Sequence, residues 1–212
     1  MTVTAPADGA TVMYGTKLGE YSQAESPTQT AVGTLVVYYR VTAGNYNACE
    51  GAATVTVKRA SFVPTVSIEG WVYGTPPNDP SINNNPGSGA VTYGYSDAAN
   101  GDYTSTVPTT AGTWYVRASV AETANYTAAT TVPVSFSITP AAITITADDK
   151  SSDYGAEMAS LTWKVSGGYV AGDDLGISAR TTATPTSDVG DYDITLSWNG
   201  NPNYSADVKN GT

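Results

Sequence analysis

The residues best suited to recognise a ligand in this sequence are aromatic. Trp71 lies between a short apolar stretch and a turn, beside Gly70, which is a position where we expect an exposed ring. Tyr73 follows two residues later, and Tyr38 and Tyr115 fall on the outward phase of predicted strands. A flat exposed ring can stack on the face of a sugar, because its body is apolar and its edge is polar. Trp71, Tyr73, Tyr38 and Tyr115 are therefore the candidate ligand-binding residues.

The composition excludes several other kinds of site. The 212 residues contain no His, so imidazole catalysis and His-ligated zinc are absent. The single cysteine, Cys49, can form neither an internal disulfide nor a thiolate cluster. The net charge of −10 argues against nucleic acid, whose binding depends on Lys and Arg. We predict no catalytic residue, no metal and no cofactor.

Two acidic clusters are the remaining candidates for ion binding. Asp148 and Asp149 lie close to Asp153, and Asp173 is next to Asp174. Calcium takes six to eight oxygen ligands, and a calcium loop spaces its carboxylates at alternate positions before a glycine. Neither cluster has that spacing, so we interpret both as solvated acidic surface.

A sequence pattern recurs three times along the chain. In each copy a glycine opens a predicted strand, and an Asn-Tyr pair follows with its Tyr 13 or 14 residues after that glycine. The three glycines are Gly33, Gly112 and Gly190, and the three pairs are Asn45-Tyr46, Asn125-Tyr126 and Asn203-Tyr204. Apolar residues occupy alternate positions of each strand, which is typical of a strand with one buried face. Such self-similarity indicates a repeat protein.

The repeats predict three modules, which cover residues 1–60, 61–140 and 141–212. The second module reads as strands near 66–68, 91–96, 113–120 and 132–138, with a loop over 76–87. The third reads as strands over 142–147, 161–165, 176–181 and 191–198, with one helical turn at 170–175. Short strands between turn residues predict an all-β protein of small immunoglobulin-like sandwich modules arranged end to end. A β-grasp-like module with one short helix is the alternative.

The two end modules are expected to be incomplete. The first has no room for the opening strand of the second, and the third reaches Thr212 where a last strand would begin. We therefore expect Asp191–Trp198 or its neighbour to have an unpaired edge, which invites strand addition from another chain. Met1–Pro6 has no features of a targeting segment, and no apolar run is long enough to span a membrane. These features suggest a piece of a longer repeat array.

The repeated aromatic pairs also have a structural interpretation. Tyr73-Gly74 and Tyr154-Gly155 are expected to form turns in which glycine supplies an unusual backbone conformation. The Asn-Tyr pairs are expected to be packing corners. Trp114, Trp163 and Trp198 lie on apolar phases of their strands, so we expect them in the core.

The third module resembles a known family of bacterial repeats. The segments 143–150, 153–156 and 161–167, continued by 189–192 and Asn203-Tyr204, are similar to the MBG domain of the Tyr-Gly-X type. The second module resembles the same group at 72–75 and 111–114, and the first only in its back half. The resemblance implies tandem domains of large secreted or cell-wall-anchored bacterial proteins, often adhesins, without catalytic residues.

The predicted function is therefore structural. The chain is expected to be a non-catalytic stalk or spacer of an adhesin, extracellular or on the bacterial cell surface. Its partners would be the neighbouring modules, with no nucleic acid and no membrane insertion in this fragment. Two alternatives remain: a module that binds host glycan or mucin, and an accessory domain of a secreted glycanase.

Overall fold

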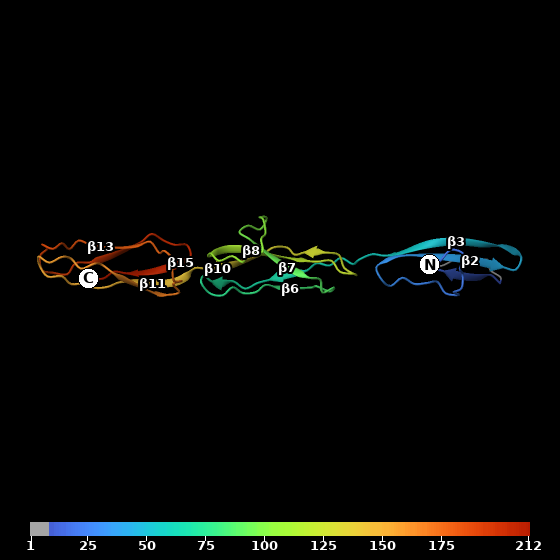
Figure 1. Cartoon of the computed structure of the whole chain (residues 1–212), viewed down its shortest axis with the longest axis horizontal. Coiled ribbons are helices and arrows are strands. Elements are labelled where there is room, and N and C mark those ends of the chain that lie inside the picture. Colours follow the sequence, from blue (N-terminus) through green and yellow to red (C-terminus); the bar gives the residue numbers. More distant parts are fainter. Residues whose placement is uncertain (1–8) are drawn as a thin grey trace. The chain divides into compact units, whose positions relative to one another are not determined.

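The computed structural model describes residues 9–212, and the expectation for Met1–Pro6 lies outside them. These residues form fifteen β-strands and no helix, so the all-β prediction is confirmed (Figure 1). Accordingly, no helix in this part of the chain could cross a membrane. The predicted helical turn at 170–175 is wrong, since only a turn at Ala171 and Gly172 is present there. The β-grasp alternative, which needs a helix, is wrong for residues 9–212.

Contacts divide the chain into two compact units. The first contains residues 9–64 together with Asn84–Val91 and Ser119–Thr130. The second contains Thr65–Asn83, Thr92–Ala118 and Thr131–Thr212. The module boundaries and the end-to-end arrangement stay predictions.

The first unit is built on one antiparallel sheet of order β1-β2-β3. Its strands are β1 (Thr11–Gly15), β2 (Gly33–Ala43) and β3 (Tyr46–Val57). Val37, on the predicted inward phase of β2, is fully buried. β3 begins directly after a tight turn at Gly44 and Asn45 and is 12 residues long.

The second unit contains the sheet of the second predicted module, ordered β5-β10-β8-β7. Its strands are β5 (Trp71–Val72), β7 (Val91–Ser96), β8 (Gly112–Val120) and β10 (Val134–Thr139). β10 lies antiparallel to β8, with Phe136 opposite Trp114, and parallel to β5, with Ile138 opposite Trp71. Phe136 and Ile138 are buried, so β10 supplies alternate side chains to the core. Ser119 and Val120, the last two residues of β8, belong to the first unit and pair there with β9 (Ala129–Thr130).

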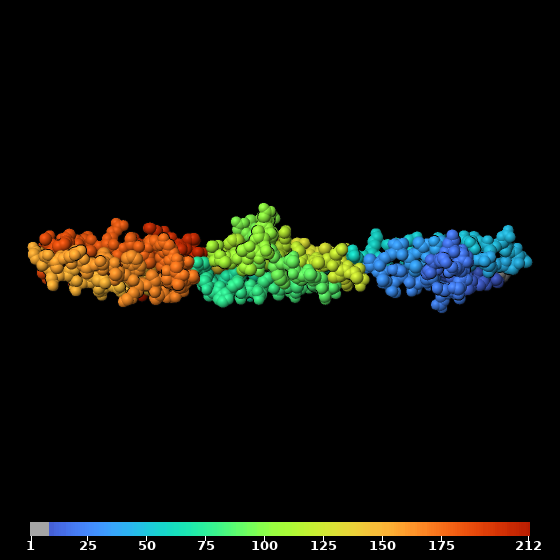
Figure 2. Space-filling model, viewed as in Figure 1, coloured from blue at the N-terminus to red at the C-terminus, as the bar shows by residue number. Residues whose placement is uncertain are grey.

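A second, smaller sheet pairs β4 (Thr65–Ser67) with β6 (Ser81–Asn83). β6 lies within 76–87, which was predicted to be loop, so that part of the prediction is wrong. Val66 is buried opposite Ile82, and this apolar pair favours strand pairing despite the prolines on either side. The segment between β7 and β8 projects from the surface (Figure 2).

Residues 141–212 form two sheets around one core. β11 (Ala141–Ala147) is central in the first sheet, antiparallel to β12 (Trp163–Gly167) and parallel to β15 (Tyr204–Lys209). The second sheet pairs β13 (Ile177–Thr181) with β14 (Ile194–Trp198). Side chains of both sheets share one buried cluster, which includes Ile143, Ile145, Ile194 and Leu196. This is the predicted sandwich, with β15 as an additional strand.

Candidate functional site

Trp71 does not form an exposed platform. It is 9% exposed and stacks on Phe136, with ring centroids 5.1 Å apart. The pairing of β5 with β10 causes this, because it places Trp71 opposite Ile138 and turns its ring toward the core. The expectation that Trp71 is exposed is therefore wrong.

The other tryptophans also depart from a simple reading of strand phase. Trp163 was expected in the core and is instead 37% exposed at the start of β12. Trp114 and Trp198 are half-buried, and the indole N–H of Trp114 donates to the Thr110 carbonyl over 3.0 Å. Strand phase predicts which face a residue occupies but not how far the opposing sheet covers it.

Tyr38 and Tyr115 are both half-buried in the middle of sheets. Tyr38 lies in β2 of the first unit, opposite Ala52 of β3. Tyr115 lies in β8 of the second unit, opposite Ser135 of β10. Neither tyrosine is among the exposed large side chains, and their role as ligand-binding residues stays a prediction.

Tyr73 is the candidate that the structure places in a polar site. Its hydroxyl donates to the Asp173 carboxylate over 2.7 Å, and the Tyr204 hydroxyl donates to the same oxygen over 2.5 Å. The two rings meet edge to face with centroids 5.4 Å apart. The Tyr204 hydroxyl also accepts the backbone N–H of Val170 over 3.1 Å. Two tyrosines 131 positions apart therefore share one carboxylate within the second unit.

The ionisation of the three groups follows from this geometry. Burial, together with the hydrogen bond to Asp173, raises the pKa of Tyr204 to about 12. The hydrogen bond to Asp173, followed by burial, raises the pKa of Tyr73. The hydrogen bonds from Tyr204 and Tyr73 lower the pKa of Asp173, because they favour its charged form. At neutral pH the site is one carboxylate held by two neutral hydroxyls.

The turn next to Tyr73 completes the contact. Gly74 has φ of +80°, and a Cβ there would lie 2.5 Å from Cγ2 of Val170. The second Tyr-Gly pair has the same backbone conformation, with φ of +81° at Gly155, but open space around it. Both pairs therefore form the predicted glycine turn. Only the first is packed against another segment, and Tyr154 is accordingly 71% exposed.

The same region holds the linker into residues 141–212. The backbone N–H of Ala141 donates to the Asn203 carbonyl over 2.9 Å, and the Asn203 side chain accepts the N–H of Ala111 over 2.8 Å. Asn203 precedes Tyr204, so one Asn-Tyr pair binds the linker, the segment before β8 and Asp173. This Asn-Tyr pair is the predicted packing corner, with Tyr204 4% exposed, whereas the prediction is wrong for the first pair, whose Tyr46 is 73% exposed.

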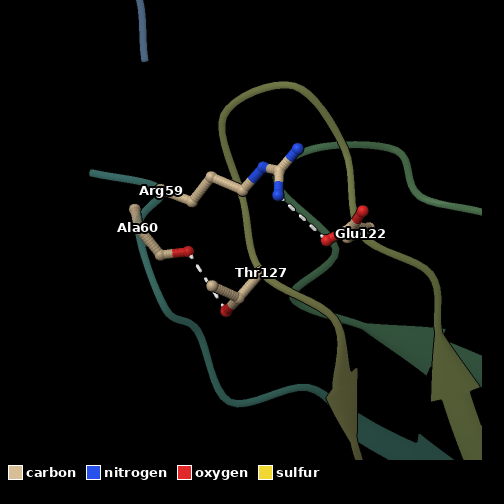
Figure 3. Close-up of polar contacts among 4 residues, drawn as sticks. All are labelled: Arg59, Ala60, Glu122 and Thr127. Carbon is tan, nitrogen blue, oxygen red and sulfur yellow. Dashed lines mark hydrogen bonds and ion pairs between the residues drawn. The ribbon is translucent and has the colours of Figure 1, made fainter. Parts of the chain in front are cut away.

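The first linker makes the corresponding bond within the first unit. The N–H of Ala60 donates to the Asn125 carbonyl over 2.8 Å, and Thr127 bonds back to the Ala60 carbonyl (Figure 3). Arg59 pairs with Glu122 over 3.0 Å (Figure 3). The Phe62 ring meets the Tyr126 ring edge to face, with centroids 5.9 Å apart. Each linker alanine thus docks on the Asn of the next Asn-Tyr pair.

The acidic clusters are used for internal bonds. Asp148 bonds Thr162 over 2.7 Å and pairs with Lys164 over 2.9 Å, and these bonds lower the pKa of Asp148. Asp173 binds the two tyrosines, so the interpretation of this residue as solvated surface is wrong. Residues 9–212 contain no cluster of acidic or cysteine side chains that could hold a metal ion.

The sequence indicated half of this site. The Tyr-Gly and Asn-Tyr pairs were visible as repeated motifs, but nothing in their spacing showed that they meet. Asp173 was noted only as part of an acidic cluster and was interpreted as solvated surface, and Val170 was missed, since both lie in an irregular segment with no periodic pattern. The available signal for Asp173 was its position two residues before the apolar Leu175, which is buried.

The comparisons bear on the third predicted module. Residues 143–212 match the family of the MBG domain (YGX type). No curated protein and no solved structure matches the chain. The match confirms the resemblance drawn from the motifs of this module, and it indicates a repeat module of bacterial surface proteins.

Proposed function

We propose that this chain is a non-catalytic spacer of an extracellular bacterial surface protein, in which the linkers between repeats are fixed by hydrogen bonds. The family match supports a surface repeat, and the two linkers support the spacer role. A spacer must resist bending where one repeat passes into the next. The backbone N–H groups of Ala60 and Ala141 each donate to the carbonyl of the Asn in an Asn-Tyr pair, so both linkers are held in the same way.

The observation that carries this proposal is the shared carboxylate of Asp173. Tyr73 comes from the second predicted module and Tyr204 from the third, and both donate to it. A hydrogen bond to a charged group is stronger than a neutral one, so this contact resists opening more than a single neutral bond would. Each of the three polar groups has a hydrogen-bonding partner within the protein, which supports a structural rather than a catalytic role.

Hydrogen exchange at the linker amides tests the proposal. The amide of Ala141, the first residue of β11, should exchange as slowly as the amides in the middle of that strand, and Tyr73→Phe should accelerate it because Asp173 loses one donor. Tyr154→Phe is the matched control, since Tyr154 precedes the same kind of glycine turn but is exposed. Fast exchange of Ala141 in the unmodified chain, or equal effects of the two variants, would contradict a fixed linker.

The adhesive alternative needs a separate test. Immobilised glycans and mucin should retain none of the chain if it is only a spacer. Specific retention that Tyr38→Ala or Tyr115→Ala abolishes would instead assign a recognition role to that tyrosine.

A further inference from the structure

Three asparagines of this chain are followed directly by glycine: Asn100, Asn199 and Asn210. Asparagine is a chemically labile residue. In an Asn-Gly pair the backbone nitrogen of the glycine can reach the side-chain amide of the asparagine, because glycine has no Cβ to obstruct the approach. The three pairs differ in the hydrogen bonds that hold these two reacting groups.

The pair at Asn210 is held on both reacting groups. The side-chain oxygen of Asn210 accepts the N–H of Leu196 over 3.0 Å. The N–H of Gly211 donates to the Ile194 carbonyl over 3.0 Å. Attack of the Gly211 nitrogen on the Asn210 amide requires both bonds to open first, and opening a paired polar group costs free energy. The fold therefore protects this pair.

The pair at Asn100 is held on the attacking group. Asn100 is exposed and lies in the projecting segment between β7 and β8 (Figure 2). The N–H of Gly101 donates to the Ala98 carbonyl over 3.1 Å and closes a turn. A Cβ at Gly101 would lie 2.5 Å from Oγ of Ser96, so the turn is packed against the end of β7. Only the side chain of this pair is free to react.

The pair at Asn199 is open on both reacting groups. Asn199 and Gly200 follow β14 directly, and both residues are exposed. Within residues 9–212, neither the Asn199 side chain nor the Gly200 N–H has a hydrogen-bonding partner. Gly200 has φ of +85°, and a Cβ built there would meet nothing within 4 Å. The attacking nitrogen and the amide that it attacks are therefore both accessible.

We propose that Asn199 is a site of spontaneous deamidation in the folded protein. The Gly200 nitrogen attacks Cγ of Asn199 and closes a cyclic imide, while the side-chain nitrogen leaves as ammonia with the proton of the Gly200 N–H. Water then opens the imide at either of its carbonyls. One opening gives aspartate, and the other gives isoaspartate, in which the main chain runs through Cβ and Cγ of residue 199. Water replaces ammonia overall, and nothing is oxidised or reduced.

The reacting pair directly precedes the corner that holds the linker. The side chain of Asn201 donates to the Asp174 carbonyl over 3.2 Å and accepts the N–H of Asn203 over 3.0 Å. The Asn203 carbonyl in turn accepts the N–H of Ala141 over 2.9 Å. Isoaspartate at position 199 adds one main-chain atom two residues before Asn201, so it displaces this corner and loosens the linker. The effect on the linker rests on the proposed spacer function, whereas the deamidation does not.

The test of the modification is incubation of the full chain in mildly alkaline buffer, followed by peptide mapping by mass spectrometry. In the folded chain Asn199 should convert at least about tenfold faster than Asn210, the ratio for a barrier difference of about 1.4 kcal/mol, with Asn100 between them. The control is the same chain unfolded in urea, where the three rates should converge because the protecting bonds are gone. Equal rates for Asn199 and Asn210 in the folded chain, or an order that urea leaves unchanged, would overturn the proposal.

Hydrogen exchange at Ala141 tests the consequence for the linker. The amide of Ala141 should exchange faster in incubated chain that carries isoaspartate at position 199 than in fresh chain. Asn199→Gln is the matched control, since it keeps the amide but its longer side chain does not close the same imide, and its exchange should not change during incubation. Asn199→Asp carries the charge without the added main-chain atom and should have a smaller effect. Unchanged exchange in the modified chain would overturn the effect on the linker. Fast exchange already in fresh chain would contradict the spacer function, while the peptide map decides the deamidation in either case.

Discussion

The ionisation of Tyr204 is the property most tightly linked to the site at Asp173. Its pKa of about 12 is two pH units above the ordinary tyrosine value of about 10. At pH 11 a tyrosine with the ordinary value would be about nine-tenths ionised, whereas Tyr204 would be about one-tenth ionised. Because its pKa is raised in the folded state, Tyr204 contributes stability that is fully present below pH 10. This contribution is lost as the pH rises through about 12.

Removal of the carboxylate separates the causes of this shift. In Asp173→Asn the pKa of Tyr204 should fall, because the charge and the charged acceptor are gone. It should stay above the ordinary value, because burial is the larger cause and Tyr204 remains 4% exposed. Tyr73→Phe should lower it less, since it keeps the carboxylate.

Carbon-13 NMR of tyrosines labelled at the ring carbon that bears the hydroxyl measures this titration for each residue. Tyr204→Phe identifies the signal by its loss. A Tyr204 midpoint at or below pH 10 in the unmodified chain, or a midpoint that Asp173→Asn leaves unchanged, would refute the reasoning.

Three further predictions follow from the same contacts. In urea unfolding, Gly74→Ala should destabilise the second unit by about 1–3 kcal/mol more than Gly155→Ala. Both variants add a Cβ at positive φ, but only the Cβ at position 74 meets Val170. Equal losses of unfolding free energy in the two variants would contradict this prediction. In the same assay Trp71→Ala should lower the free energy of unfolding by about 3–5 kcal/mol, because it leaves a cavity at a buried position. A change below about 1 kcal/mol would mean that the ring is not in the core. Arg59→Ala should cost at most about 1 kcal/mol, with less effect in high salt, because its ion pair is largely exposed; a larger, salt-independent loss would give this pair a greater role than its exposure allows.

Acid should weaken the Asp173 site as well. The pKa of Asp173 is lowered in the folded state, so the stability that this carboxylate contributes to the fold is fully present above the unfolded pKa near 3.8. It is lost as the pH falls below that value and through the lower folded pKa. Exchange at Ala141 should therefore accelerate in acid more in the unmodified chain than in Asp173→Asn, after correction for the intrinsic rate. Equal acceleration of exchange in the two chains would show that protonation of Asp173 does not affect the linker amide of Ala141.

The strands could be predicted from the sequence where one face is buried. Residues 91–96 were located without error, and 112–120 and 141–147 to within one residue, because apolar side chains alternate along them. β6 was missed because it has three residues between breakers, and its pairing depends on Val66, 16 positions away. β15 was missed because its pairing is with β11, so nothing local specifies it.

The site was predictable only in its local half. The glycine turn at Gly74 and the corner at Tyr204 follow from residue type, and both were expected. That Tyr73 and Tyr204 meet on Asp173 depends on how the strands of the second unit are paired, which no spacing of motifs specifies. Trp71 was assigned to the surface for the same reason, since its burial depends on the parallel pairing of β5 with β10.

Residual dipolar couplings test the central claim most directly. The backbone couplings of the second-unit residues 65–83, 92–118 and 131–139, and those of 141–209, would be measured in one weakly aligned sample of the full chain. A linker fixed by Asn203 and Asp173 predicts that one alignment tensor fits both sets of couplings. Two tensors of different magnitude for the two sets would show that they move independently, and would contradict the fixed linker on which the proposed spacer function rests.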